Sequence, residues 1–173
     1  MSDSVGKELK DWFVNAEKIV VAGIGNPIRS DDYVGLKIVK ALQGKVPDTV
    51  CLLECETVPE SYILDIEQFQ PTHVLLIDAA FLELKPGEAQ LVAAERIVDY
   101  AAVSTHALPL RIFCEHVQKV TGAKIGLLLI EPADMEFGEG LSVEAECAAE
   151  RLTTLLLEHL VSRPLFFSKR SWR

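Results

Sequence analysis

Cysteine is scarce in this chain of 173 residues, and the four cysteines form no CxxC pair. The spacing of Cys51, Cys55, Cys114 and Cys147 gives no support to a structural zinc site, and we expect reduced, half-buried core residues. Long apolar runs are absent as well, since IVVAGIG and IGLLLI fall far short of the roughly 18 residues that span a bilayer. We therefore expect no insertion into a membrane.

Basic residues are also few, with 17 Lys and Arg against 26 Asp and Glu, and the net charge is −9. A phosphate backbone would be repelled, so nucleic acid is excluded as an expected partner. The last twelve residues, SRPLFFSKRSWR, hold four of the basic side chains and no acid. We expect one domain over residues 1–162 and a basic tail over 163–173, a frayed end resting on the acidic surface in preference to a docking peptide.

A secretory signal is not visible, because the start of the chain, MSDSVGKELKDW, is polar and acidic. We expect a cytoplasmic protein. Hydrophobic residues make up 49% of the chain, which excludes wholesale disorder. The oligomeric state is left open, with a monomer favoured.

Short apolar runs alternate with stretches of helical periodicity, which is typical of an α/β protein. The runs show no strict alternation of apolar and polar residues, as expected of strands covered on both faces. We predict a three-layer α/β/α fold with a mainly parallel, twisted sheet of about five strands. The expected strands are 19–24, 50–54, 74–78 and 125–130, and the expected helices are 7–13, 32–42, 59–69, 109–120 and 143–160. Residues 84–92 contain a Pro-Gly turn and predict a local hairpin or an antiparallel edge strand.

The first candidate site is the glycine turn GIGNPIRSDD, which follows the first expected strand. A dinucleotide fingerprint would need a third glycine where Ile28 stands, so that match is weak. The turn holds two adjacent carboxylates instead, Asp31 and Asp32, which would attract a cation. The alternative is that Ser30 or Asp31 caps the helix.

Asp78 and His106 are the other candidates. Asp78 ends a buried strand, at the sheet edge where ligands gather in open α/β folds, although it could be a simple turn aspartate. His106 lies in a loop before an expected helix, whereas His73, His116 and His159 fall at less suitable places. Two carboxylates and an imidazole would suit a divalent cation of borderline hardness. Neither an HExxH motif nor a GxSxG elbow is present.

Several of these motifs occur together in one known family. From about residue 19 to residue 142 the chain resembles the hydrogenase maturation endopeptidases, which trim the large-subunit precursor of [NiFe] hydrogenases. The resemblance rests on GIGNPIRSDDYVG, TVPE, LLIDAA, KPGE and STHALPL, which occur in the family's order.

The resemblance implies a function and a site. It implies an endopeptidase of the aspartic type that removes a C-terminal extension of the precursor after nickel insertion. Asp32, Asp78 and His106 would form the catalytic and nickel-sensing trio. Gly25, Asn26 and Asp31 would shape the turn around them, and Tyr33 stands where the family usually has glycine, which would change the cleft entrance or the peptide accepted.

The same resemblance implies that no metal is permanently bound. Nickel would arrive with the precursor, although Zn or Cd could occupy the same donors. The rivals are a non-catalytic nucleotide-binding or scaffold domain, supported by the glycine turn and by Glu54 or Glu56, and a hydrolase of small molecules with a resident metal.

Overall fold

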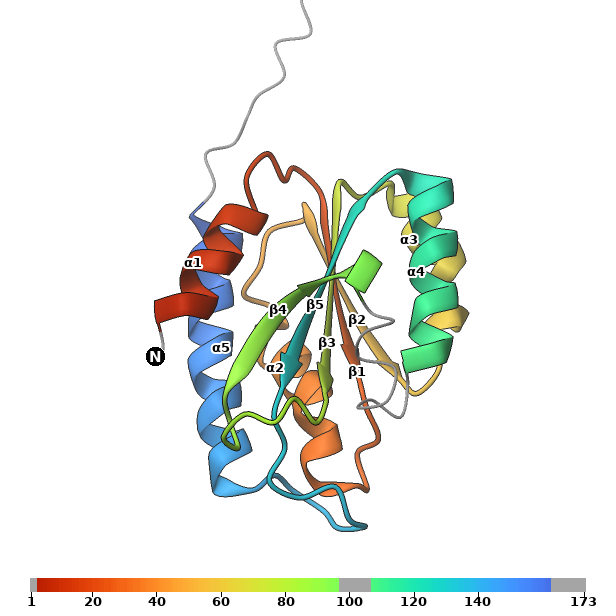
Figure 1. Cartoon of the computed structure of the whole chain (residues 1–173). Coiled ribbons are helices and arrows are strands. Elements are labelled where there is room, and N and C mark those ends of the chain that lie inside the picture. The colour runs from red at the N-terminus through yellow and green to blue at the C-terminus, as the bar shows by residue number, and fades with distance from the viewer. Residues whose placement is uncertain (1–2, 97–106, 163–173) are drawn as a thin grey trace, which may run out of the picture.

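The computed structural model describes residues 3–96 and 107–162 (Figure 1). Its elements are, in chain order, α1 (Asp3–Trp12), β1 (Ile19–Ile24), the 3-10 turn η1 (Ser30–Tyr33), α2 (Val34–Leu42), β2 (Val50–Glu56), the 3-10 turn η2 (Pro59–Tyr62), α3 (Ile63–Phe69), β3 (His73–Ala79), β4 (Ala89–Ala93), α4 (Ala107–Thr121), β5 (Lys124–Ile130) and α5 (Val143–Val161). The prediction for the tail over 163–173 lies outside the described residues.

The five strands form one sheet in the order β2-β1-β3-β5-β4. β1 pairs in parallel with both β2 and β3, β3 pairs in parallel with β5, and β4 pairs antiparallel with β5. The predicted mainly parallel sheet with one antiparallel edge strand is confirmed. Of the two interpretations of residues 84–92, the edge strand is right and the local hairpin is wrong, because β4 pairs with a strand that comes later in the chain.

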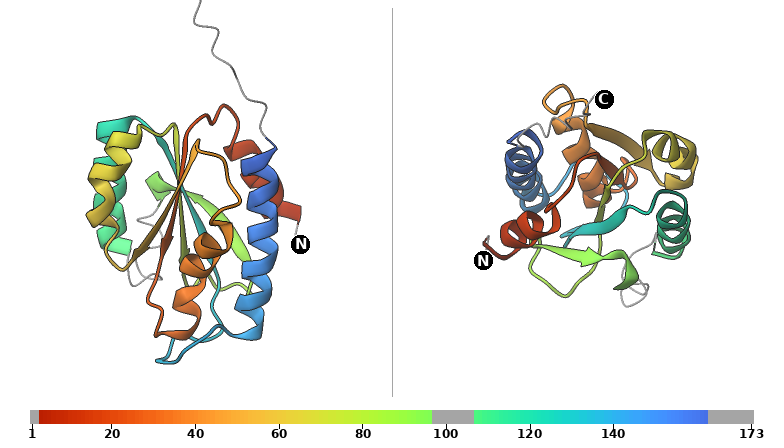
Figure 2. Two further views of the ribbon diagram at one scale, coloured as in Figure 1. Left: turned by 180° about the vertical axis from the view of Figure 1, so that it is seen from behind. Right: turned by 90° about the horizontal axis from the view of Figure 1, so that it is seen from above.

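Helices cover both faces of the sheet, with α1, α2 and α5 on one side and α3 and α4 on the other (Figures 1 and 2). Each side has its own hydrophobic core, one built around Trp12, Ile38 and Leu152 and the other around Ile66 and Phe113. β1 and β3 lie between these cores and are buried at every residue. This explains their unbroken apolar sequences, since neither face of these strands meets water.

The cysteine prediction is partly wrong. Cys55 and Cys114 are buried and Cys51 is partly buried, but Cys147 is exposed on α5. All four are free thiols. Cys147 lies on α5, which packs against the core through Ala148, Leu152 and Leu156. The cysteine residue type alone did not show which face of this helix Cys147 occupies.

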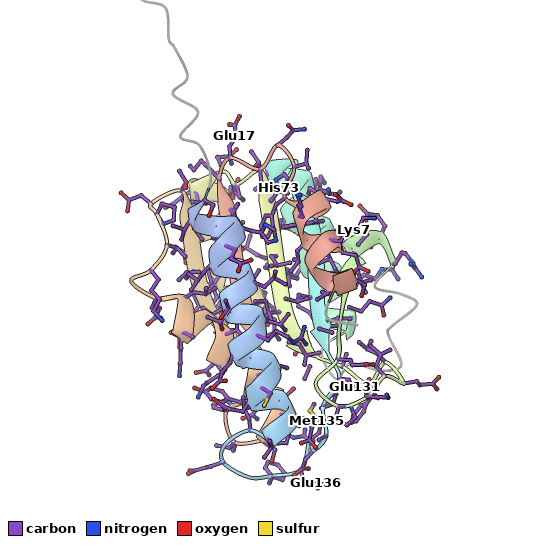
Figure 3. All side chains as sticks on the ribbon, turned by 90° about the vertical axis from the view of Figure 1, so that its left-hand side faces the viewer. Lys7, Glu17, His73, Glu131, Met135 and Glu136 are labelled. Carbon is purple, nitrogen blue, oxygen red and sulfur yellow. The ribbon has the colours of Figure 1, made fainter. Side chains whose placement is uncertain are left out.

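The strand order reverses between β1 and β3. From β1 the chain continues to β2 on one side, and it then returns to β3 and continues to β5 on the other side. In open α/β sheets the crevice at the carboxyl ends of two such strands is the usual ligand site. Figure 3 shows Glu17 and His73 at the amino edge of the sheet and Glu131, Met135 and Glu136 at the carboxyl edge. Among the described helices, none is long and apolar enough to cross a membrane.

Candidate active site

The turn after β1 depends on a glycine that no other residue can replace without a backbone shift. Gly25 has φ +137°, and a Cβ placed on it would lie 1.6 Å from the backbone oxygen of Asp32. Its N–H donates a hydrogen bond of 2.8 Å to the backbone oxygen of Glu56, the last residue of β2. The missing side chain therefore lets the turn fold back onto η1, where Asp32 lies.

Two further glycines let the first turn of α2 rest on the ends of β1 and β3. A Cβ on Gly35 would lie 2.2 Å from the backbone oxygen of Ile77 and 2.6 Å from that of Ile24. A Cβ on Gly23 would lie 2.6 Å from the backbone oxygen of Gly35. The first turn of α2 therefore lies over the crevice between the two strands, and Gly35, three residues after Asp32, rests on Ile77, the residue that precedes Asp78.

Asp32 and Asp78 are both buried at this crevice, with exposed fractions of 2% and 0%. Asp32 accepts a hydrogen bond of 2.9 Å at Oδ2 from the N–H of Asn26. Asp78 accepts one of 2.9 Å at Oδ1 from the N–H of Ala79. η1 packs against β3, so two of the three predicted site residues are brought to the same edge of the sheet.

Asp31 forms hydrogen bonds with a loop that lies about a hundred residues later in the chain. Its Oδ2 accepts hydrogen bonds from the N–H groups of Ala133 and Asp134 and from the hydroxyl of Ser142, at 2.7, 3.0 and 2.8 Å. Its Oδ1 accepts a fourth, of 2.7 Å, from the N–H of Ser142. Neither η1 nor α2 has a side-chain cap, so the alternative that Ser30 or Asp31 caps the helix is wrong. The two adjacent acids thus have different surroundings.

In the sequence, Asn26 precedes Asp31 and Asp32, and Tyr33 follows them. The Asn26 side chain accepts a hydrogen bond of 3.1 Å from the N–H of Ile28, which closes the turn. Tyr33 faces Lys40 along α2, with the Lys40 Nζ 5.3 Å from the centre of its ring. A hydrogen bond to the Tyr33 hydroxyl raises the pKa of Lys40, and the carboxylate of Glu54 acts in the same direction.

Glu131 is a buried acid at the same edge that the sequence analysis missed. It follows β5, is 6% exposed, and accepts hydrogen bonds at Oε2 from the N–H groups of Leu82 and Leu84, at 2.6 and 3.2 Å. It therefore fixes the segment that leaves β3 just after Asp78. The signal that could have found it is the one that identified Asp78, an acid directly after a buried strand.

The third proposed site residue, His106, lies outside the described residues, as does Ser104. α4 begins at Ala107, the next residue, and runs from the carboxyl edge to the amino edge, where β5 starts (Figure 1). Within residues 3–96 and 107–162, no group of three or more His, Cys, Asp or Glu side chains could hold a metal ion.

Glu54, the acid that supported the nucleotide-binding alternative, is engaged elsewhere. Its carboxylate accepts a hydrogen bond from the side chain of Gln43 and forms an ion pair of 3.6 Å with Lys40. In dinucleotide-binding domains this position binds the ribose hydroxyls. The contacts of Glu54 tie β2 to α2 instead.

Comparisons with known proteins agree on one family. The family model described as hydrogenase maturation protease matches residues 36–159. A protein of Methanocaldococcus jannaschii whose name places it among the hydrogenase maturation proteases is 32% identical over 158 residues, covering 87% of this chain and 92% of the relative.

Solved structures give the same result. The chain is similar to the crystal structure of a [NiFe] hydrogenase maturation protease, HycI, from Thermococcus kodakarensis, with a TM-score of 0.82, 35% identity, and coverage of 89% of this chain and 99% of that one. It is also similar to the hydrogenase maturating endopeptidase HybD from Escherichia coli, with a TM-score of 0.72, 26% identity, and coverage of 83% and 92%.

Proposed function

The chain belongs to the hydrogenase maturation protease family, and we propose that it is the endopeptidase that removes the C-terminal extension of a [NiFe] hydrogenase large-subunit precursor after nickel insertion. The observation that carries this proposal is the burial of Asp32 and Asp78 together at the crevice between β1 and β3. Buried carboxylates are costly unless their charge has a use or a partner, so the pair favours a site that meets a cation or a proton.

Nickel enters this proposal as part of the substrate. Carboxylate oxygens and an imidazole nitrogen are suitable donors for Ni(II), and Zn(II) or Cd(II) would accept the same set. Asp32, Asp78 and His106 would contact the ion that the precursor carries, so the protein would need no permanently bound metal. The position of α4 supports a role for His106, because this helix begins at the next residue, Ala107, at the carboxyl edge of the sheet (Figure 1).

Two routes to cleavage fit these residues. In one, Asp32 or Asp78 takes a proton from water, the water oxygen bonds to the scissile carbonyl carbon, and the C–N bond breaks as the departing amine gains a proton. This route would make the enzyme an aspartic-type peptidase. In the other, the two carboxylates would hold the precursor's nickel, which would polarise the carbonyl; water would then add to the carbonyl carbon, and the C–N bond would break as the amine gains a proton.

We also place this activity in the cytoplasm. Cys51, Cys55, Cys114 and Cys147 are all free thiols, which fits a reducing compartment.

The test is incubation of the purified protein with a hydrogenase large-subunit precursor, prepared with and without nickel, followed by intact-mass measurement of the large subunit. We expect loss of a C-terminal peptide from the nickel-loaded precursor alone. If neither precursor is shortened, the proposed endopeptidase function is wrong. If both are shortened at the same rate, the dependence on nickel is wrong.

A further inference from the structure

Two exposed apolar residues lie on neighbouring backbone segments close in the chain to the candidate active site. Ile28 is 54% exposed and Phe137 is 77% exposed. A parallel bridge joins Arg29 to Gly138, so the residues before them, Ile28 and Phe137, are lateral neighbours. Ile28 is four residues from Asp32 in the turn after β1, and Phe137 comes from the loop after β5. We call these two residues the apolar tip.

The backbone under the apolar tip is held by hydrogen bonds. The N–H of Ser30 donates to the oxygen of Gly138 at 2.9 Å, and the N–H of Gly138 donates to the oxygen of Ile28 at 3.0 Å. The Arg29 guanidinium donates to the oxygen of Met135 at 3.2 and 3.3 Å and lies 5.4 Å from the centre of the Phe137 ring. Binding to such a surface costs little ordering of the loop.

Hydrogen bonds also tie the apolar tip to the acids. The Asp31 carboxylate accepts hydrogen bonds from the loop at Ala133, Asp134 and Ser142, on both sides of Phe137. A partner that contacts Ile28 and Phe137 would therefore be held in a fixed place relative to the turn that carries Asp32. Isolated exposed apolar residues need no explanation, whereas here two of them lie on backbone segments that are joined by hydrogen bonds and linked to the turn that carries Asp32, which suits a recognition surface.

The charge around the apolar tip indicates what kind of partner fits. The loop after β5, EPADMEFGEGLS, carries four acids and no basic residue. Asp134, Glu136 and Glu139 of this loop are exposed, while Arg29 is engaged by Met135 and Phe137. A segment with Lys or Arg beside an apolar side chain would complement this surface.

We infer that the apolar tip is the docking surface for the protein substrate and takes an apolar side chain flanked by Lys or Arg on the precursor. This inference rests on the proposed function and adds a recognition element outside the acid pair. Three other exposed apolar residues also follow strands at this edge of the sheet, namely Val58 after β2 and Phe81 and Leu84 after β3.

The test measures the Kd of the nickel-loaded precursor and the kcat and KM of its cleavage for wild type, Ile28→Ser, Phe137→Ser and the double variant. The matched control is Val14→Ser, which replaces an apolar residue of similar exposure, 58%, in the turn before β1 at the amino edge. We expect each tip substitution to raise Kd and KM about tenfold, with kcat at saturation within about twofold of wild type. Glu136→Lys with Glu139→Lys should slow association at low salt.

The outcomes separate the two proposals. If wild type binds the precursor but does not cleave it, the proposed function is wrong. The Kd values of the tip variants and of Val14→Ser then still show whether the apolar tip is the docking surface. If the tip variants bind the precursor as tightly as Val14→Ser does, the docking inference is wrong. If the protein alone self-associates and Phe137→Ser abolishes that association, a second copy occupies the tip and the inference is also wrong.

Discussion

Asp31 and Ser142 are 111 residues apart in the sequence and share two hydrogen bonds, from the Ser142 N–H to Oδ1 at 2.7 Å and from its hydroxyl to Oδ2 at 2.8 Å. Ser142 is also the N-cap of α5, where its Oγ accepts a hydrogen bond of 3.2 Å from the N–H of Ala145. One buried carboxylate thus joins the turn after β1, the loop after β5 and the start of the last helix. This network holds the turn on which Asp32 lies.

Asp31→Asn should destabilise the fold. The amide nitrogen of asparagine cannot accept a hydrogen bond, so at least one of the donors Ala133, Asp134 and Ser142 would face another donor in a buried place. We expect the free energy of unfolding to fall by about 3 kcal/mol in urea titrations. Asp48→Asn makes the same chemical change at an exposed position and serves as the control. Equal free energies of unfolding for the two variants would show that the hydrogen bonds of Asp31 do not stabilise the fold.

Gly25→Ala should be far more damaging than Gly44→Ala. Both glycines have positive φ, +137° and +71°, but a Cβ on Gly25 meets the Asp32 backbone whereas one on Gly44 meets nothing within 4 Å. We expect a loss of about 3 kcal/mol or more for Gly25→Ala and about 1 kcal/mol for Gly44→Ala. Thermal or urea unfolding measures both, and similar losses would contradict the close approach of the turn to η1.

The four thiols should differ in reactivity. Burial raises the pKa of Cys55 and of Cys114 to about 12, so at pH 8 only about one in ten thousand of these groups is a thiolate in the folded protein. Cys147 is exposed. Titration with a thiol reagent should modify Cys147 first, and Cys55 and Cys114 only after denaturation. Rapid labelling of all four in the native protein would contradict the burial.

The same pKa shifts predict how stability depends on pH. Because the folded state holds Cys55 and Cys114 as neutral thiols, their contribution is complete below about pH 9 and is lost as pH rises from there toward 12. Cys55→Ala and Cys114→Ala should reduce this alkaline loss in urea titrations at pH 8 and pH 10. An unchanged pH dependence in both variants would contradict the prediction.

Metal removal should leave the protein unchanged if nickel belongs to the substrate. We expect metal analysis of the purified protein to find far less than one equivalent, and we expect a chelator to leave the Tm unaltered. Retention of a stoichiometric metal through purification, with a lower Tm after chelation, would favour a hydrolase with a resident metal.

Much of the fold could be predicted from the sequence because the strands are apolar on both faces. β1 agrees with the predicted range at both ends, while β2, β3 and β5 extend by one or two residues, to include polar ends such as Glu56, His73 and Lys124. The predicted helix over 32–42 begins later, at Val34, because Ser30–Tyr33 forms a separate 3-10 turn. Apolar periodicity does not distinguish a 3-10 turn from the first turn of a helix.

The site could be predicted less completely. Strand ends and the glycine turn correctly bring Asp32 and Asp78 to one edge, since the carboxyl ends of parallel neighbours meet. The partners of Asp31 are about a hundred residues distant, so no local spacing could reveal them. Glu131 carried the same local signal as Asp78, an acid directly after a buried strand, but its role could not be predicted, because its partners Leu82 and Leu84 lie almost fifty residues earlier in the chain.

The most direct test of the account is the cleavage rate of the nickel-loaded precursor by Asp32→Asn, Asp78→Asn and His106→Ala, beside wild type and the Asp48→Asn control. Variants whose Tm shows that they are folded should cleave at least about a hundredfold more slowly, because each loses a group that holds the ion or moves a proton. Asp48→Asn should cleave at the wild-type rate. Removal of the extension at equal rates by all five proteins would contradict the assignment of the active site.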